Sequence, residues 1–161
     1  MLNLVRAAAA VAALTVALPA AAQETIRLTV AAGHPPIFLW VKHVRETFMP
    51  TVDAELAKTG KYKIAWNEAY GGTLAKIGSE LETMQQGISD MGIVATVFQS
   101  AKLPLNNVTY FVPFGPPDAN VVTKAIDYVQ ALPELTAEWN KFGVVYLAGF
   151  GLWLVTFTLP T

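Results

Sequence analysis

The chain has 161 residues, of which 53% are hydrophobic and 14% are charged, with 11 basic and 12 acidic side chains. This length fits one domain with a sizeable core, and the near-zero charge excludes the basic surface of a nucleic-acid binder. The absence of cysteine excludes disulfide scaffolds, cysteine zinc sites and thiol catalysis.

The N-terminus has the pattern of a secretory signal peptide. Arg6 precedes an uncharged apolar run over residues 7–18, and the small residues Ala20 and Ala22 follow. The run is shorter than the ~20 residues of a membrane-spanning helix. We therefore expect residues 1–22 to be removed on export. The alternative is a buried alanine-rich helix. An exported chain without cysteine fits a bacterial periplasm.

The first mature segments predict a strand and a long helix. Residues 25–31 alternate apolar and polar side chains and are rich in β-branched types, which is typical of a strand. Apolar residues then recur every three or four positions over residues 38–56, which predicts an amphipathic helix. Pro50 predicts a kink or break within it, and Gly60 predicts its end.

A second strand, a second helix and a buried strand are expected next. Residues 61–66 alternate again, and residues 73–86 carry a helical apolar stripe that Gly87 closes. Residues 91–98 form a continuous apolar run, which predicts a strand buried on both faces.

The following region is irregular and then helical. Residues 102–117 hold four prolines and many aromatic residues. Residues 118–132 predict a helix with Asp118 as its N-cap. Pro133 fits the first turn of a further helix over residues 134–142.

Two strand-like runs, residues 143–150 and 152–159, complete the pattern. The alternation of strands and helices predicts an α/β fold with a mostly parallel sheet flanked by helices. Residues 142–159 carry no charge, so a membrane-spanning helix is an alternative, although their glycines and β-branched residues favour strands.

The chain has two histidines, His34 and His43, and neither has the spacing of a metal-ligand pair. His43 is expected on the exposed side of the first helix. His34 follows the first strand, where open α/β sheets bind ligands, so we predict that it lines a pocket. A plain turn residue is the alternative.

Gly71, Gly72 and Thr73 are predicted to open the second helix, where free N–H groups can hold an anion. The segment is neither a dinucleotide fingerprint nor a nucleotide-binding P-loop. The alternative is a simple turn with Thr73 as N-cap.

Catalytic chemistry has little support. Glu80 and Glu82 are two positions apart on a predicted helix and therefore point to different faces. No nucleophile elbow is present. We expect no catalytic residue, no metal and no cofactor. Ser79 or Glu80 can reach a pocket, whereas Glu82 is expected in solvent.

Tyr110, Phe111 and Phe114 are interleaved with prolines after the buried strand. They either cap the core or form a rigid apolar wall for a ligand, and their position after a strand favours the wall.

Residues 63–115 resemble the solute-binding proteins of TRAP transporters, the DctP family. The resemblance rests on G-G-T-L at 71–74, M-Q-Q-G-I-S-D-M-G-I at 84–93 and K-L-P-L-N-N-V-T-Y-F-V-P-F-G at 102–115. It extends over residues 26–160.

The resemblance implies a periplasmic receptor without catalytic activity. Such receptors bind an organic acid, a carboxylate, between two α/β lobes and deliver it to TRAP membrane subunits for ion-gradient-driven uptake. Residues 23–161 would then be the first periplasmic-binding-protein-like lobe, with the second lobe absent. The ligand-binding residues implied for this lobe are His34, Tyr70, Gly72, Thr73, Ser79, Glu80, Thr96, Phe98, Tyr110 and Phe114.

Two departures from the family follow. The family's second-lobe arginine, which pairs with the ligand carboxylate, has no counterpart in Arg6, Arg27 or Arg45. Trp153 stands where many relatives carry a ligand-facing arginine or ring residue. It is predicted to contact ligand, and it favours a bulky or aromatic carboxylate. If the protein ends at Thr161, we expect poor solubility and weak ligand binding.

Two other functions remain open at this point. One is an exported α/β hydrolase, and the other is a membrane-anchored domain with a helix at residues 142–159.

Overall fold

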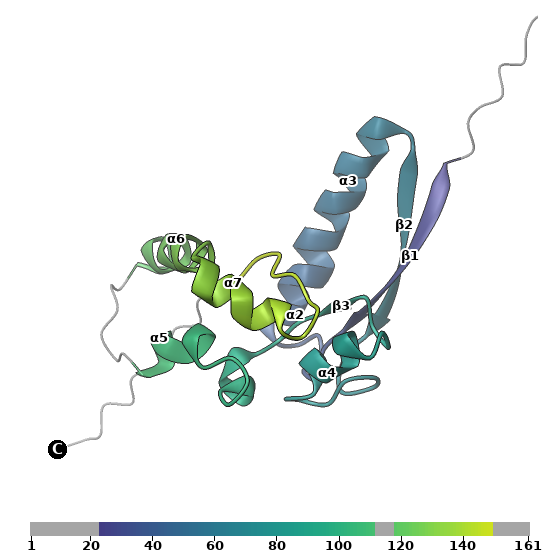
Figure 1. Cartoon of the computed structure of the whole chain (residues 1–161). Helices are drawn as coiled ribbons and strands as arrows, with labels where there is room; N and C mark the ends of the chain where they lie inside the picture. The colour runs from purple at the N-terminus through teal and green to yellow at the C-terminus, as the bar shows by residue number, and fades with distance from the viewer. Residues whose placement is uncertain (1–22, 112–117, 150–161) are drawn as a thin grey trace, which may run out of the picture.

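The computed structural model describes residues 23–111 and 118–149. It confirms the α/β class with a parallel sheet (Figure 1). The strands are β1 (Glu24–Ala31), β2 (Tyr62–Ala69) and β3 (Met91–Gly92), in the order β2-β1-β3. The predicted signal peptide and the predicted strand at 152–159 lie outside the described residues.

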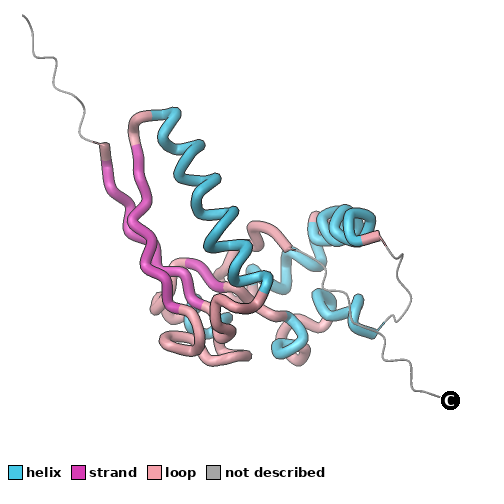
Figure 2. Tube along the Cα trace, turned by 180° about the vertical axis from the view of Figure 1, so that it is seen from behind, coloured by secondary structure: helices cyan, strands magenta, loops and turns pink. Residues whose placement is uncertain are grey.

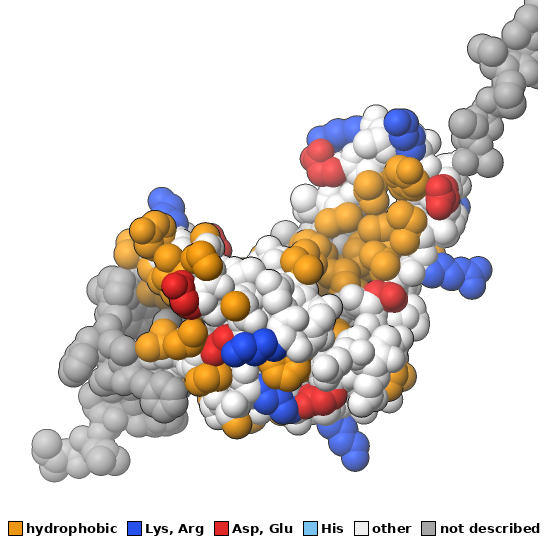
Figure 3. Space-filling view, in the orientation of Figure 1, with side chains coloured by type: hydrophobic (Ala, Val, Ile, Leu, Met, Phe, Trp, Pro, Cys, Tyr) orange, Lys and Arg blue, Asp and Glu red, His pale blue; other side chains and the backbone are white. Residues whose placement is uncertain are grey.

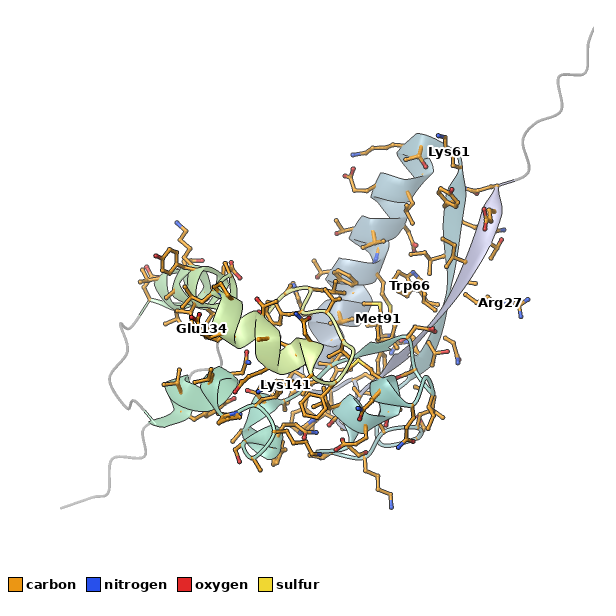
Figure 4. The ribbon with its side chains drawn as sticks, in the orientation of Figure 1. Arg27, Lys61, Trp66, Met91, Glu134 and Lys141 are labelled. Atoms are coloured by element: carbon orange, nitrogen blue, oxygen red, sulfur yellow. The ribbon has the colours of Figure 1, made fainter. Side chains whose placement is uncertain are left out.

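The long strands β1 and β2 pair along their whole length. Ile26 lies opposite Ile64 and Leu28 opposite Trp66. Paired residues of parallel strands share a face, so these apolar side chains line one side of the sheet. Figure 4 shows Trp66 directed toward the neighbouring helix and Arg27 directed away from it. Both predicted strands are confirmed, and β2 extends three residues past its predicted end.

The predicted helix at 38–56 consists of three consecutive helical parts. They are α2 (Leu39–His43), a π-helical turn η1 (Val44–Phe48) and α3 (Met49–Thr59). The wide turn ends at Phe48, two residues before Pro50. Proline has no N–H, and in a regular α-helix its ring would clash with the carbonyl one turn earlier, which a wider turn relieves. The proline thus changes the helix without ending it. Gly60 ends α3 with a positive φ of 65°, as predicted.

The first core cluster lies between these helices and the sheet. Trp66 of β2 packs against Phe48 with ring centroids 6.5 Å apart, and its Nε1 donates to Asp53 of α3. Figures 1 and 2 show α3 running along one face of β1 and β2. The buried members of the cluster are Val30, Ala32, Val41, Met49 and Tyr70.

The helix predicted over residues 73–86 is shorter than expected. Only α4 (Glu80–Gln85) is helical, and residues 71–78 form turns. Gly72 and Gly78 have φ values of 81° and 82°, which a right-handed helix cannot contain. The prediction from the apolar stripe was therefore wrong at its start. The predicted stop at Gly87 is confirmed, with φ 69°.

The strand predicted over residues 91–98 is also much shorter. β3 has two residues, and the N–H of Ile93 makes a last bond of 2.9 Å to the Ala31 carbonyl. β1 ends at Ala31, so the later residues have no partner there, and Thr96–Gln99 turn into a 3₁₀ helix, η2. Met91 and Gly92 are half-buried, so the prediction of burial on both faces was wrong.

The C-terminal half is helical. Asp118 caps its longest helix, because its Oδ1 accepts from the Asn120 N–H at 2.8 Å, as predicted. Pro133 stands in the first turn of the next helix, also as predicted, and that helix ends at Asn140. The elements are the 3₁₀ helix η3 (Leu105–Asn107), α5 (Val108–Phe111), α6 (Ala119–Gln130) and α7 (Pro133–Asn140).

Residues 143–149 form no strand, contrary to prediction, because the described part of the sheet offers them no strand to pair with. They cover the second core cluster instead, where Val144 and Tyr146 pack against Leu81, Leu103 and Trp139. Across residues 23–111 and 118–149, no helix has both the length and the apolar character required to cross a membrane.

Candidate functional site: an apolar cleft at the strand ends

The order β2-β1-β3 creates a topological switch point. The chain leaves β1 toward β2 on one side and returns to β3 on the other. The loops that follow β1 and β3 therefore separate, and open α/β sheets bind ligands in the crevice between such loops. The fold places this crevice beyond Ala31 and Gly92, the last residues of the two strands.

A cleft of about 1920 Å³ occupies this position. Its walls come from the loop after β1, β3 and the residues 93–98 that follow it, helices α6 and α7, and residues 143–149. One face of α6, with Val122, Ile126 and Val129, lines it. These are the residues that the sequence places on one side of this helix. Figure 3 shows hydrophobic side chains gathered over α6.

His34 lies at the centre of an aromatic corner, which we define as His34, Phe38, Trp40 and Phe98. The His34 ring is 6% exposed. Its centroid lies 4.8 Å from that of Phe38, 5.1 Å from Trp40 and 5.9 Å from Phe98. The first two contacts are edge-to-face, which is a preferred geometry for aromatic pairs. All four side chains line the cleft.

The glycine turn holds the His34 loop in place. The Gly71 N–H donates to the His34 carbonyl at 3.1 Å, and the Gly72 N–H donates to the Ala32 carbonyl at 3.2 Å. Both glycines have positive φ, which this turn requires. These N–H groups are therefore occupied, and the predicted anion site at a helix start is wrong. Thr73 is no N-cap either, since its hydroxyl donates to the Tyr70 carbonyl.

The Glu80 side chain also holds the loop that carries His34, through a hydrogen bond from the Gly33 N–H. It is 1% exposed, and its carboxylate accepts from the Gly33 N–H at 3.2 Å and the Gly78 N–H at 2.8 Å. Ser79 donates to the Lys76 carbonyl. Neither residue lines the cleft. Glu82, predicted in solvent, is instead half-buried and forms an ion pair with Lys102.

The predicted ligand-binding residues fall into three groups. The structure brings His34, Thr96, Phe98 and Tyr110 to the cleft wall. Five others do not line the cleft, namely Tyr70, Gly72, Thr73, Ser79 and Glu80. Of these, Gly72 and Glu80 hold the His34 loop through hydrogen bonds to Ala32 and Gly33. Phe114 and Trp153 lie outside the described residues. Phe111 belongs to α5.

Formal charge is almost absent from the cleft. Asp90 is the one carboxylate among the described lining residues, and it already accepts from the Thr29 N–H at 2.7 Å. No lysine or arginine is among them. His43 lies on the wall and is exposed, as predicted. The described residues contain no group of three side chains able to hold a metal ion.

Sequence reasoning missed part of the wall. Trp40 was not singled out, although it follows Phe38 by two positions in the segment after a strand end. Asn106 and Gln130, which also line the cleft, were missed as well. The Asn106 amide oxygen accepts from Gln130 Nε2 at 2.6 Å, a contact between two elements that no local pattern signals.

Two tyrosines have a raised pKa, and one of them, Tyr146, lines the cleft. Burial raises the pKa of Tyr70 to about 12, and the nearby Glu68 carboxylate adds to the effect. Burial likewise raises the pKa of Tyr146 to about 12, with a smaller contribution from Asp127. Both phenols therefore stay neutral at physiological pH and act as packing groups.

No known family model matches the chain, and no curated protein matches it in sequence.

Proposed function

We propose that the chain is the periplasmic solute-binding component of a TRAP transporter of the DctP type. In this role it captures an organic acid and delivers it to membrane subunits for ion-gradient-driven uptake, without catalysis. The observation that carries the proposal is the apolar cleft at the switch point of a parallel sheet, which His34, Thr96, Phe98 and Tyr110 line. The sequence resemblance over residues 26–160 supports the same reading.

The cleft's chemistry fits binding better than turnover. Its walls are apolar and aromatic with a few polar groups, which is the usual composition of a small-molecule site. The His34 ring contacts other rings, and no hydroxyl nucleophile bonds to it among the described residues. A receptor needs only this arrangement plus a way to close over its ligand.

Titration calorimetry of the gene's complete product with a panel of mono- and dicarboxylates tests the proposal. We expect one saturable binding event for at least one acid and no consumption of it. Release of the protein from spheroplasts with the periplasmic extract is expected in parallel. Failure of every acid to bind, or hydrolysis of an ester or amide panel, would contradict the proposal.

A further inference from the structure

The aromatic corner presents two ring surfaces to the cleft. Phe38 is 38% exposed and Phe98 is 54% exposed, while His34 between them is buried. The two phenylalanines come from different segments, the loop after β1 and the 3₁₀ helix after β3. Exposed rings on two walls of a crevice leave apolar area that a flat apolar group can cover.

The charges of the cleft restrict what can enter it. A dicarboxylate carries two charges, and each loses hydration on entering an apolar site unless a cation or several donors replace the water. The described lining residues offer no lysine or arginine, and Asp90 would repel a second anionic group. The described wall therefore favours a ligand with a single carboxylate placed near His34.

His34 can supply the polar contact. Among the described residues its ring makes aromatic contacts and no hydrogen bond, so its ring N–H remains available to a ligand. A histidine N–H donated to a carboxylate is a charge-assisted bond when the ring is protonated. The hydroxyl of Thr96 is a second donor on the same wall.

From these observations we propose that the ligand is an aromatic monocarboxylate, whose ring packs on Phe38 and Phe98 and whose carboxylate accepts from His34. The inference rests on the proposed binding function and narrows its ligand class. It is independent of Trp153, which lies outside the described residues.

Calorimetry of the complete gene product with phenylacetate, cinnamate and succinate tests the inference. We expect the two aromatic acids to bind at least about tenfold more tightly than succinate. Phe98→Ala and Phe38→Leu should each weaken phenylacetate binding by about tenfold. Ile88→Ala removes an exposed apolar side chain outside the cleft and should leave it unchanged. His34→Phe keeps the ring packing, and it should weaken phenylacetate far more than the neutral methyl ester.

Tighter binding of succinate would overturn the inference and leave the proposed function standing. Phenylacetate binding that is unchanged in both Phe98→Ala and Phe38→Leu would also overturn it. Absence of binding by any acid to the wild-type protein would remove the proposed function itself, and the ligand class with it.

Discussion

Glu80 and Gly33 are 47 positions apart, and a buried hydrogen bond of 3.2 Å joins the Gly33 N–H to the Glu80 carboxylate. The other carboxylate oxygen accepts from Gly78 at 2.8 Å. One side chain thus ties the start of α4 to the loop that carries His34. These two hydrogen bonds give the buried Glu80 carboxylate a structural role, although Glu80 does not line the cleft.

Glu80→Gln should destabilise the protein by about 2 kcal/mol. The glutamine NH₂ group would face either the Gly33 or the Gly78 N–H, so one of these donors would lose its acceptor. Urea denaturation of wild type and variant measures the change. Glu55→Gln is the matched control, since Glu55 is exposed and forms a surface ion pair with Lys58, and it should lose less than about 0.5 kcal/mol. Equal stability of Glu80→Gln and wild type would contradict the role assigned to the carboxylate.

Gly33 itself leaves no room for a side chain. A Cβ added there would lie 2.4 Å from the backbone nitrogen of Ile77 and 2.6 Å from Glu80 Oε1. Backbone cannot move aside cheaply, so Gly33→Ala should cost about 3 kcal/mol or prevent folding.

Gly87→Ala provides the comparison for Gly33→Ala. Gly87 also resists substitution, but only through its φ of 69°, since nothing lies within 4 Å of an added Cβ. We expect a loss of about 1 kcal/mol there. Thermal unfolding of the two variants should separate them clearly, and a Gly33→Ala protein as stable as Gly87→Ala would show that the loop is less tightly packed.

Asn106 is the centre of the network that joins η3 to α6 and α7. Its amide nitrogen donates to Glu138 at 2.8 Å, and its amide oxygen accepts from Trp139 Nε1 at 3.0 Å and from Gln130. Asn106→Ala leaves these buried partners unsatisfied and should cost about 3 kcal/mol. Urea unfolding followed by tryptophan fluorescence reports it. Asn140→Ala, at the exposed end of α7, should be near neutral, and a similar loss in both variants would argue against the network.

The sequence predicted what depends on local pattern and missed what depends on distant partners. The alternation in β1 and β2, the cap at Asp118 and the stop at Gly60 all rest on neighbouring residues, and all are confirmed. The apolar run at 91–98 has the composition of a strand, but its pairing ends where β1 ends.

In the candidate site, too, local sequence patterns were predictive and contacts between distant residues were not. His34 could be placed at a strand end from the sequence, because strand ends bind ligands in this fold class. The turn at Gly71 and Gly72 was misread, because its N–H groups bond to carbonyls of the preceding loop, 37 and 40 positions away from Gly71 and Gly72 respectively. The Glu80 contact to Gly33 escapes sequence analysis for the same reason.

Tyr70 should make stability fall at alkaline pH. Its pKa is raised to about 12 from the ordinary 10.0, mainly by burial, so the folded protein keeps the phenol proton after the unfolded chain has lost it. The unfolded state then binds fewer protons, and the free energy of unfolding decreases as pH rises. The contribution is complete below about pH 10 and is lost as pH rises through about 12. Tyr146, raised to about 12 as well, acts in the same direction.

Urea unfolding of wild type, Tyr70→Phe and Tyr128→Phe at about pH 8 and about pH 11 measures this effect. Phenylalanine has no proton to lose, so Tyr70→Phe should lose less stability between the two pH values than wild type. Tyr128 is 75% exposed, so its replacement should leave the wild-type dependence intact. Tyr70→Phe also removes only a weak hydroxyl contact of 3.9 Å to Met49 Sδ, so the fold should persist. If Tyr70→Phe and wild type lose the same stability between the two pH values, the Tyr70 hydroxyl has the same pKa in the folded and unfolded states. Its burial would then not protect the phenol proton.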